Sequence, residues 1–186
     1  MGRNVTIGHC TCLGFPEDGE DDCLIGDNVK IGCFCVISIG STMGNNVQID
    51  HYCRVGRGSK IGEGTKLLYG ARIHEDVVIG KNCIIGGNCP NGVVIEDKVT
   101  HMGRIVHNYS NPNLDWDLTE EPSPRICSGA VIGANALIIG GITIGSGSYI
   151  VAGEIVRHDV PPNVVLSKGK SYSQSEWKGK IQLRSL

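Results

Sequence analysis

Several features that would place this sequence in a common class are missing. No apolar run approaches the roughly 18 residues of a membrane-spanning helix, and no charged stretch followed by an apolar one opens the chain as a secretory signal would. The formal net charge is only -2, without the basic surplus of a nucleic-acid-binding protein. These absences predict a cytoplasmic protein that binds neither membranes nor nucleic acid.

The usual secondary-structure periods are missing as well. The spacing of the apolar residues fits neither an amphipathic helix, whose period is about 3.6, nor a strand in which every second residue is apolar. From residue 25 to residue 85 an aliphatic residue instead recurs every six residues without a miss. The series is Ile25, Ile31, Ile37, Met43, Ile49, Val55, Ile61, Leu67, Ile73, Ile79 and Ile85. The chain therefore carries a hexapeptide repeat.

The fifth position of each six-residue unit, or hexad, is also patterned. Small or β-branched residues occupy it: Val29, Cys35, Ser41, Val47, Cys53, Ser59, Thr65, Ala71, Val77, Cys83 and Cys89. The first and fifth positions share a parity, so a short extended run can point both side chains inward before glycine and polar residues turn a corner. Three such runs per turn predict a triangular rod whose turns stack through parallel ladders about 4.8 Å apart.

The nine cysteines do not require a disulfide framework or a zinc site. No paired Cys-x-x-Cys spacing occurs, so His9, Cys10, Cys12 and Cys23 are interpreted as structural residues. Four further cysteines fall on the inward fifth position, where a thiol acts as a compact hydrophobe. Stacked inner thiols favour a reducing compartment, in agreement with a cytoplasmic protein.

The repeat resembles that of the left-handed β-helix acyltransferases, whose hexads run aliphatic, Gly, two variable residues, a small residue and a variable one. The resemblance implies an all-β fold, a single-stranded left-handed parallel β-helix over residues 1–166. The left hand comes from the resemblance, because right-handed crossovers are the rule for parallel strands. Pro161 and Pro162 are expected to end the repeat, since proline cannot donate to a ladder. Residues 167–186 are expected to form a tail or cap.

The repeat is interrupted twice. After Cys89, the segment Pro90-Asn91-Gly92 is interpreted as a turn that breaks the register, which resumes at Ile95. The larger interruption is an excursion over about residues 107–125, after which periodicity returns at Ile126. A patternless loop of about twenty residues is uncommon in a compact domain unless it is a lid or a binding loop. We therefore expect function to lie at this excursion.

The last coils are similar to those of the galactoside, maltose and xenobiotic acetyltransferases in particular. The similarity is carried by Ile132-Gly133-Ala134-Asn135-Ala136, by residues 144–148 and by the closing residues 156–164. In that family a long loop leaves the helix just after a histidine, and His107 stands at the same departure point. The resemblance implies that His107 is the general base, which suits imidazole with its ordinary pKa near about 6.5. A histidine that merely anchors the loop is the alternative.

Three residues of the excursion, Asn108, Tyr109 and Trp116, are expected to contact the acceptor or to orient His107. For Trp116, packing of the loop onto the rod is an equally good interpretation. His101 is a rival base, but it falls on an inward first position and is expected to be a hydrogen-bonded core histidine.

By the same resemblance the donor is acetyl-coenzyme A, lying in a groove between rods. The residues implied to bind it are Ala134, Gly140, Gly141, Ala152, Arg157, His158 and Lys168. Arg157 and His158 stand where the relatives commonly carry threonine and lysine, although arginine still suits phosphate through its fork of donors. Lys168 is equally well interpreted as a solvated side chain. A groove between rods implies an oligomer, and the resemblance suggests a homotrimer with sites between subunits.

The sequence thus predicts an acetyltransferase that acts, with no metal, on a hydroxyl or amine of a sugar or nucleotide-sugar. One alternative is a zinc enzyme, because His74, His101 and His107 loosely imitate the histidines of the gamma-class carbonic anhydrases, with a spacing of six rather than five between the last two. The other is a structural or ice-binding solenoid, which would need a flat array of threonines that the mixed outward positions do not provide.

Overall fold

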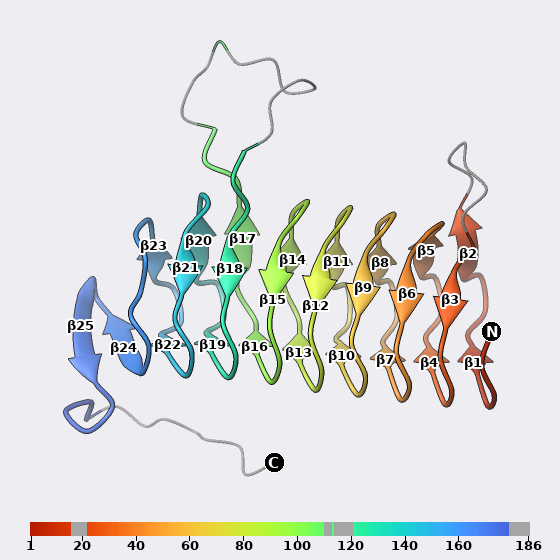
Figure 1. The fold of residues 1–186 in the computed structure, drawn as a ribbon, viewed down its shortest axis with the longest axis horizontal. Coiled ribbons are helices and arrows are strands. Elements are labelled where there is room, and N and C mark those ends of the chain that lie inside the picture. The colour runs from red at the N-terminus through yellow and green to blue at the C-terminus, as the bar shows by residue number, and fades with distance from the viewer. Residues whose placement is uncertain (16–21, 110–112, 114–120, 179–186) are drawn as a thin grey trace.

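The computed structural model describes residues 1–15, 22–109, 113 and 121–178 of the chain. Within these ranges the chain forms strands and turns, with no helix long and apolar enough to cross a membrane. The strands wind into a triangular rod, with the N-terminal coils at one end and the C-terminal coils at the other (Figure 1). The predicted all-β parallel solenoid is confirmed, while its left hand rests on the resemblance.

The three walls of the rod are sheets, here called A, B and C. Sheet A contains β1 (Thr6–Ile7), β4 (Lys30–Ile31), β7 (Gln48–Ile49), β10 (Lys66–Leu67), β13 (Ile84–Ile85), β16 (Thr100–His101), β19 (Val131–Ile132), β22 (Tyr149–Ile150), β24 (Val164–Ser167) and β25 (Lys170–Ser173). Sheet B contains β2 (Cys12–Phe15), β5 (Val36–Ser38), β8 (Arg54–Val55), β11 (Arg72–Ile73), β14 (Asn88–Cys89), β17 (Arg104–Val106), β20 (Leu137–Ile139) and β23 (Ile155–Val156). Sheet C contains β3 (Leu24–Ile25), β6 (Thr42–Met43), β9 (Lys60–Ile61), β12 (Val78–Ile79), β15 (Val94–Ile95), β18 (Arg125–Ile126) and β21 (Thr143–Ile144).

The aliphatic series of the hexads forms the core, as predicted. Ile25, Ile31 and Ile37 lie on three successive walls, in β3, β4 and β5. Along each wall equivalent residues stack in register, for example Ile31 on Ile49 and Ile49 on Leu67. All of these side chains are buried, and each fully buried aliphatic side chain contributes roughly 1.5–3 kcal/mol of transfer free energy.

The chain turns between walls at three edges, which we name A/B, B/C and C/A after the sheets that they join. Each four-residue corner of a full hexad holds one residue with a positive φ, a conformation that asparagine and glycine tolerate best. At the C/A edge this residue is Asn28 (φ 57°), Asn46 (φ 60°), Gly64 (φ 69°) and Asn82 (φ 55°) in successive coils. The turn residues of the sequence are thus explained by the backbone of the corners.

The predicted register break lies one corner earlier than expected. Cys89 does not occupy a fifth position, because it stacks on Ile73 as the first position of sheet B. The short corner is Gly86-Gly87, between Ile85 and Cys89, and Pro90-Asn91-Gly92 is an ordinary corner. A second short corner, Met102-Gly103, follows His101. These two short corners lie at the A/B edge, where they stack on each other; a third four-residue step, from Val156 to Val160, lies at the B/C edge.

The two prolines do not end the repeat, contrary to expectation. Pro161 and Pro162 lie in a C/A corner, after a parallel bridge between Val160 and Ile144. The chain then forms β24, which pairs in parallel with β22, and turns back as β25, antiparallel to β24. A proline in a corner removes no ladder hydrogen bond, so the solenoid continues for one more wall.

The cysteines are free thiols. Cys35, Cys53 and Cys83 are buried at fifth positions, as predicted, and Cys89 is buried at a first position. Burial raises the pKa of Cys53 to about 11 and that of Cys89 to about 12. These inner thiols therefore remain protonated and unreactive near neutral pH.

Candidate active site

His107 lies at the B/C edge, directly after β17, where the chain leaves the rod (Figure 1). Its side chain is half-buried, and its ring meets the ring of Tyr109 edge-on, with centroids 5.8 Å apart. The Nδ1 atom of His107 is buried and has no hydrogen-bond partner. One ring nitrogen is thus enclosed at the point where the excursion leaves the rod.

Two glycines hold the ends of the excursion against the next coil. A Cβ atom at Gly140 would lie 3.1 Å from the Cβ atom of Asn108, and one at Gly141 would overlap Pro122. Gly140 also has a φ of +80°, which favours glycine. We predicted that these glycines let coenzyme A approach the backbone, whereas their contacts in one protomer are with the excursion.

The returning end of the excursion is fixed by polar contacts. The Ser123 hydroxyl donates a hydrogen bond of 2.7 Å to the Asn91 carbonyl. Two residues later, the Arg125 guanidinium pairs with Glu96 at 2.6 Å. The other oxygen of Glu96 accepts from the backbone N–H and the hydroxyl of Ser128, and these hydrogen bonds, with Arg125, hold the pKa of Glu96 below its usual range. The excursion is therefore anchored at both ends.

The predicted acceptor residues are only partly described. Asn108 and Tyr109 are exposed and lie beside His107 at the B/C edge, so the structure brings these three together. The prediction for Trp116 lies outside the described residues. His107, Asn108 and Tyr109 lie together because they are adjacent in the sequence.

The predicted coenzyme A residues divide between two edges of the rod. Ala134, Ala152 and Lys168 follow strands of sheet A, and all three are exposed at the A/B edge. Gly140, Gly141, Arg157 and His158 follow strands of sheet B and lie at the B/C edge, with His107. Sheet B separates the two sets, so one protomer alone does not gather them into one groove.

The histidines of the zinc alternative do not converge. His101 is buried in the core, with Nε2 3.4 Å from the Asn88 carbonyl. His74 Nε2 lies 3.1 Å from the side-chain oxygen of Asn88, at the B/C edge. Within the part of the chain that the structure describes, no three His, Cys, Asp or Glu side chains are grouped as metal ligands.

Burial makes His101 a source of acid sensitivity. Desolvation lowers its pKa from 6.5 to about 4, against a small opposing effect of the Asn88 carbonyl, and Nδ1 has no hydrogen-bond partner. The unfolded chain therefore binds a proton below pH about 6.5 that the folded chain does not. The associated stability is present above that pH and is lost as the pH falls toward the folded-state pKa.

We expect the free energy of unfolding to fall by about 2 kcal/mol between pH 7 and pH 5 on account of His101. His101→Leu should remove this pH dependence, because leucine fits between Ile85 and Ile132, which stack on either side. Urea unfolding at several pH values checks the expectation, with the exposed His9 changed to Gln as the control. An unchanged slope in His101→Leu would contradict it.

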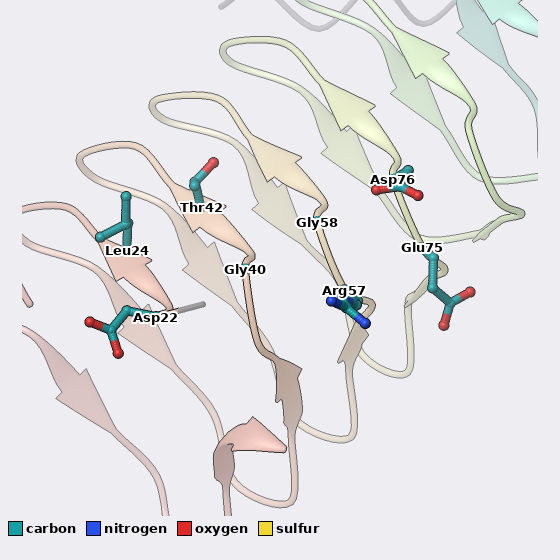
Figure 2. Close-up of a pocket in the computed structure, with 8 residues that line it drawn as sticks. All are labelled: Asp22, Leu24, Gly40, Thr42, Arg57, Gly58, Glu75 and Asp76. Carbon is teal, nitrogen blue, oxygen red and sulfur yellow. The ribbon is translucent and has the colours of Figure 1, made fainter. Parts of the chain in front are cut away.

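Sequence reasoning missed a pocket at the B/C edge of the N-terminal coils. The pocket has a volume of about 690 Å³ and is lined by Asp22, Leu24, Gly40, Thr42, Arg57, Gly58, Glu75 and Asp76. Figure 2 shows Asp22 at one end, Glu75 and Asp76 at the other, and Arg57 between them. The Glu75 backbone N–H donates to Asn91, the residue that holds the excursion. The only sequence signal was the pair of charged corner residues Arg57 and Glu75, which are three hexads apart.

Comparison with known proteins agrees with the repeat. Residues 40–74 and 58–89 match the family model described as bacterial transferase hexapeptide (six repeats). Bifunctional protein GlmU of Geobacillus sp. (strain WCH70) is 26% identical over 190 residues, which cover 99% of this chain and 33% of the relative. Serine acetyltransferase of Buchnera aphidicola (subsp. Acyrthosiphon pisum) is 35% identical over 98 residues, which cover 50% of this chain and 34% of the relative.

The chain thus spans about a third of the length of these curated relatives. Among solved structures, UDP-N-acetylglucosamine acyltransferase from Campylobacter jejuni superimposes with a TM-score of 0.57 at 17% identity, over 92% of this chain and 68% of that one. At this identity the likeness concerns the fold alone. The predicted resemblance is therefore confirmed: the chain is a hexapeptide-repeat protein, similar over residues 40–89 to the bacterial hexapeptide transferases.

Proposed function

We propose that the protein transfers an acetyl group from acetyl-coenzyme A to a hydroxyl or amine of a sugar or nucleotide-sugar, with His107 as general base. The observation that carries the proposal is the position of His107 at the start of the anchored excursion, half-buried beside Tyr109 and with Nδ1 enclosed, which leaves Nε2 as the proposed reacting nitrogen. The names of two similar proteins, a serine acetyltransferase and a UDP-N-acetylglucosamine acyltransferase, support acyl transfer to a hydroxyl or amine.

In the proposed reaction His107 Nε2 takes the proton of the acceptor hydroxyl while the oxygen attacks the thioester carbonyl carbon. The tetrahedral intermediate places negative charge on the former carbonyl oxygen, which backbone N–H groups of a neighbouring coil stabilise. Collapse of the intermediate breaks the carbon–sulfur bond. The protonated imidazole returns the proton to sulfur, so that an acetyl ester and free coenzyme A are formed.

The acceptor is proposed to lie along the B/C edge, beside Asn108 and Tyr109. The pocket lined by Asp22, Glu75 and Asp76 opens on the same edge, two coils before His107. Its carboxylates accept hydrogen bonds from hydroxyl or ammonium groups, which suits a polar, sugar-like compound.

We propose a homotrimer because the residues assigned to coenzyme A lie on two edges of one rod. A cyclic trimer uses two different patches of each protomer at every interface. It can therefore place the A/B edge of one rod, with Ala134, Ala152 and Lys168, against the B/C edge of the next, with His107, Arg157 and His158.

The proposal is tested by following thiol release from acetyl-coenzyme A with a panel of nucleotide-sugars, free sugars and L-serine. We expect release above background hydrolysis with at least one acceptor, and a product whose mass has increased by one acetyl group. Absence of release with every acceptor, from a protein whose trimeric mass is confirmed by light scattering, would argue against the transferase.

A further inference from the structure

The two short corners at the A/B edge create a notch that contains none of the residues assigned so far to the base or to coenzyme A. The notch has a volume of about 310 Å³ and is lined by Gly70, Arg72, Gly86, Gly87, Asn88, Met102, Gly103, Arg104 and Asn135. Each short corner lacks two of the residues that the corners before and after it contain. The edge is therefore recessed over two coils, between Gly70 on one side and Asn135 on the other.

The floor of the notch is formed by the backbone of successive coils, which lie close together because glycine occupies the contact positions. A Cβ atom at Gly87 would overlap the Gly103 carbonyl and would lie 2.6 Å from His101 Nε2, while one at Gly103 would overlap the Ala136 carbonyl. The floor is thus rigid, and it is backed by the buried ring of His101.

Two arginines stand on the sheet B side of the notch. Arg72 and Arg104 both align with Asn88 in the parallel ladder, one strand on either side of it. Their backbones are therefore about 9.6 Å apart, a separation that two arginine side chains can close on one diphosphate group. Neither arginine forms an ion pair with a described residue. Arg54 aligns with Arg72 one coil earlier, in the same outward-facing column of sheet B, and it pairs with Glu75 at 3.0 Å.

An exposed aromatic ladder leads along the A/B edge to the notch. The rings of Phe34 and Tyr52 stack with centroids 5.1 Å apart, and those of Tyr52 and Tyr69 lie 5.4 Å apart. These side chains are 49%, 53% and 65% exposed. Phe34 and Tyr52 occupy the positive-φ position of their corners, at 58° and 59°, where most other corners carry asparagine or glycine. The ladder ends at Tyr69, next to Gly70 of the notch.

We propose that the notch binds a nucleoside diphosphate, with the diphosphate between the guanidinium groups of Arg72 and Arg104 and a flat ring on Tyr69. Arginine recognises phosphate oxygens through two parallel hydrogen bonds, and a base stacks on an aromatic side chain. The recessed floor lets the diphosphate come close to the backbone. The binding of a nucleoside diphosphate does not depend on the proposed function; only its assignment to a nucleotide-sugar or to coenzyme A rests on that function.

A nucleoside diphosphate occurs in both substrates of the proposed reaction, as part of a nucleotide-sugar and of coenzyme A. Arg104 begins β17 and His107 follows the end of the same strand, so within one protomer sheet B separates the notch from the base. In the proposed trimer the A/B edge, which holds the notch, lies against the His107 of the next rod. Both sources are therefore compatible with transfer at His107, and direct binding measurements separate them.

The test is calorimetric binding of UDP, inorganic pyrophosphate, UDP-N-acetylglucosamine and coenzyme A to the full chain at one salt concentration. We expect UDP and pyrophosphate to bind, and Arg72→Gln and Arg104→Gln each to weaken both by about tenfold or more. Arg54→Gln, in the same column but outside the notch, should change affinity by less than about twofold. Tyr69→Leu should weaken UDP and spare pyrophosphate, while Phe34→Leu, two coils away, should spare both.

The measurements with UDP-N-acetylglucosamine and coenzyme A show which of the two substrates supplies the nucleoside diphosphate. If the arginine substitutions weaken UDP-N-acetylglucosamine, the notch serves the acceptor, and if they weaken coenzyme A, it serves the donor. The proposal is overturned if neither UDP nor pyrophosphate binds, or if Arg54→Gln weakens binding as much as the notch substitutions do. His107→Ala should retain binding, so a failure of acetyl transfer and a failure of the notch are distinguishable.

Discussion

Replacing His107 with alanine is expected to lower the turnover of a hydroxyl acceptor by about 100- to 10,000-fold, with a much smaller change in KM. An alcohol is a weak nucleophile, and its proton must leave as the oxygen attacks, so loss of the base removes an interaction made only in the transition state. The measurement is steady-state thiol release with the best acceptor found in the screen.

The control for this experiment is His9→Ala. His9 is an exposed histidine in the first coil, far along the rod from the excursion, and its replacement should leave turnover within about twofold of the wild type. A loss of less than about tenfold in His107→Ala would contradict a role as general base toward a hydroxyl. Such a result would point to an amine acceptor, because an uncharged amine attacks a thioester without deprotonation.

Introducing a side chain at Gly87 is expected to be the most disruptive change in the rod. In Gly87→Val the new atoms would overlap the Gly103 carbonyl and press on the buried ring of His101. The obstructing atoms belong to the backbone and to an enclosed ring, so neither can rotate away. We expect the free energy of unfolding to fall by at least about 3 kcal/mol, measured by urea unfolding.

The matched control is Gly70→Asn at the preceding corner of the same edge. Gly70 has a φ of +70° and no atom within 4 Å of an added Cβ, and asparagine tolerates this backbone conformation. Its replacement should cost less than about 1 kcal/mol. Equal stability of Gly87→Val and the wild type would show that the short corners do not stack as described.

The fold could be predicted closely because the hexad is a local rule. An aliphatic residue at the first position and a small one at the fifth both point inward, and glycine or asparagine turns the corner, so each hexad specifies its own wall. Ile25, Ile31 and Ile37 accordingly lie on three successive walls. Errors arose where the rule was applied by counting. Cys89 was assigned to a fifth position because it follows Ile85 by four residues, yet it is a first position behind a shortened corner.

The candidate site could be predicted only in part. His107, Asn108 and Tyr109 are neighbours in sequence, and any fold that interrupts the rod at this point keeps them together. The residues assigned to coenzyme A are not neighbours: Ala152 and Arg157 follow successive walls and lie on different edges, and the hexads do not specify which edges meet between two rods. The same limit hid the pocket of Asp22 and Glu75, whose members are three coils apart along one edge.

Sequence alone determined the repeat, the walls and the position of the excursion, because each follows from side chains within one or two hexads of each other. Only the tertiary structure decided which corners are short, which prolines fall in turns, and which charges meet along an edge. Those outcomes depend on how one coil lies on the next, since residues about eighteen positions apart become neighbours through stacking. Arg72 and Arg104 are an example, for they face one notch only because Gly87 and Gly103 let two coils approach.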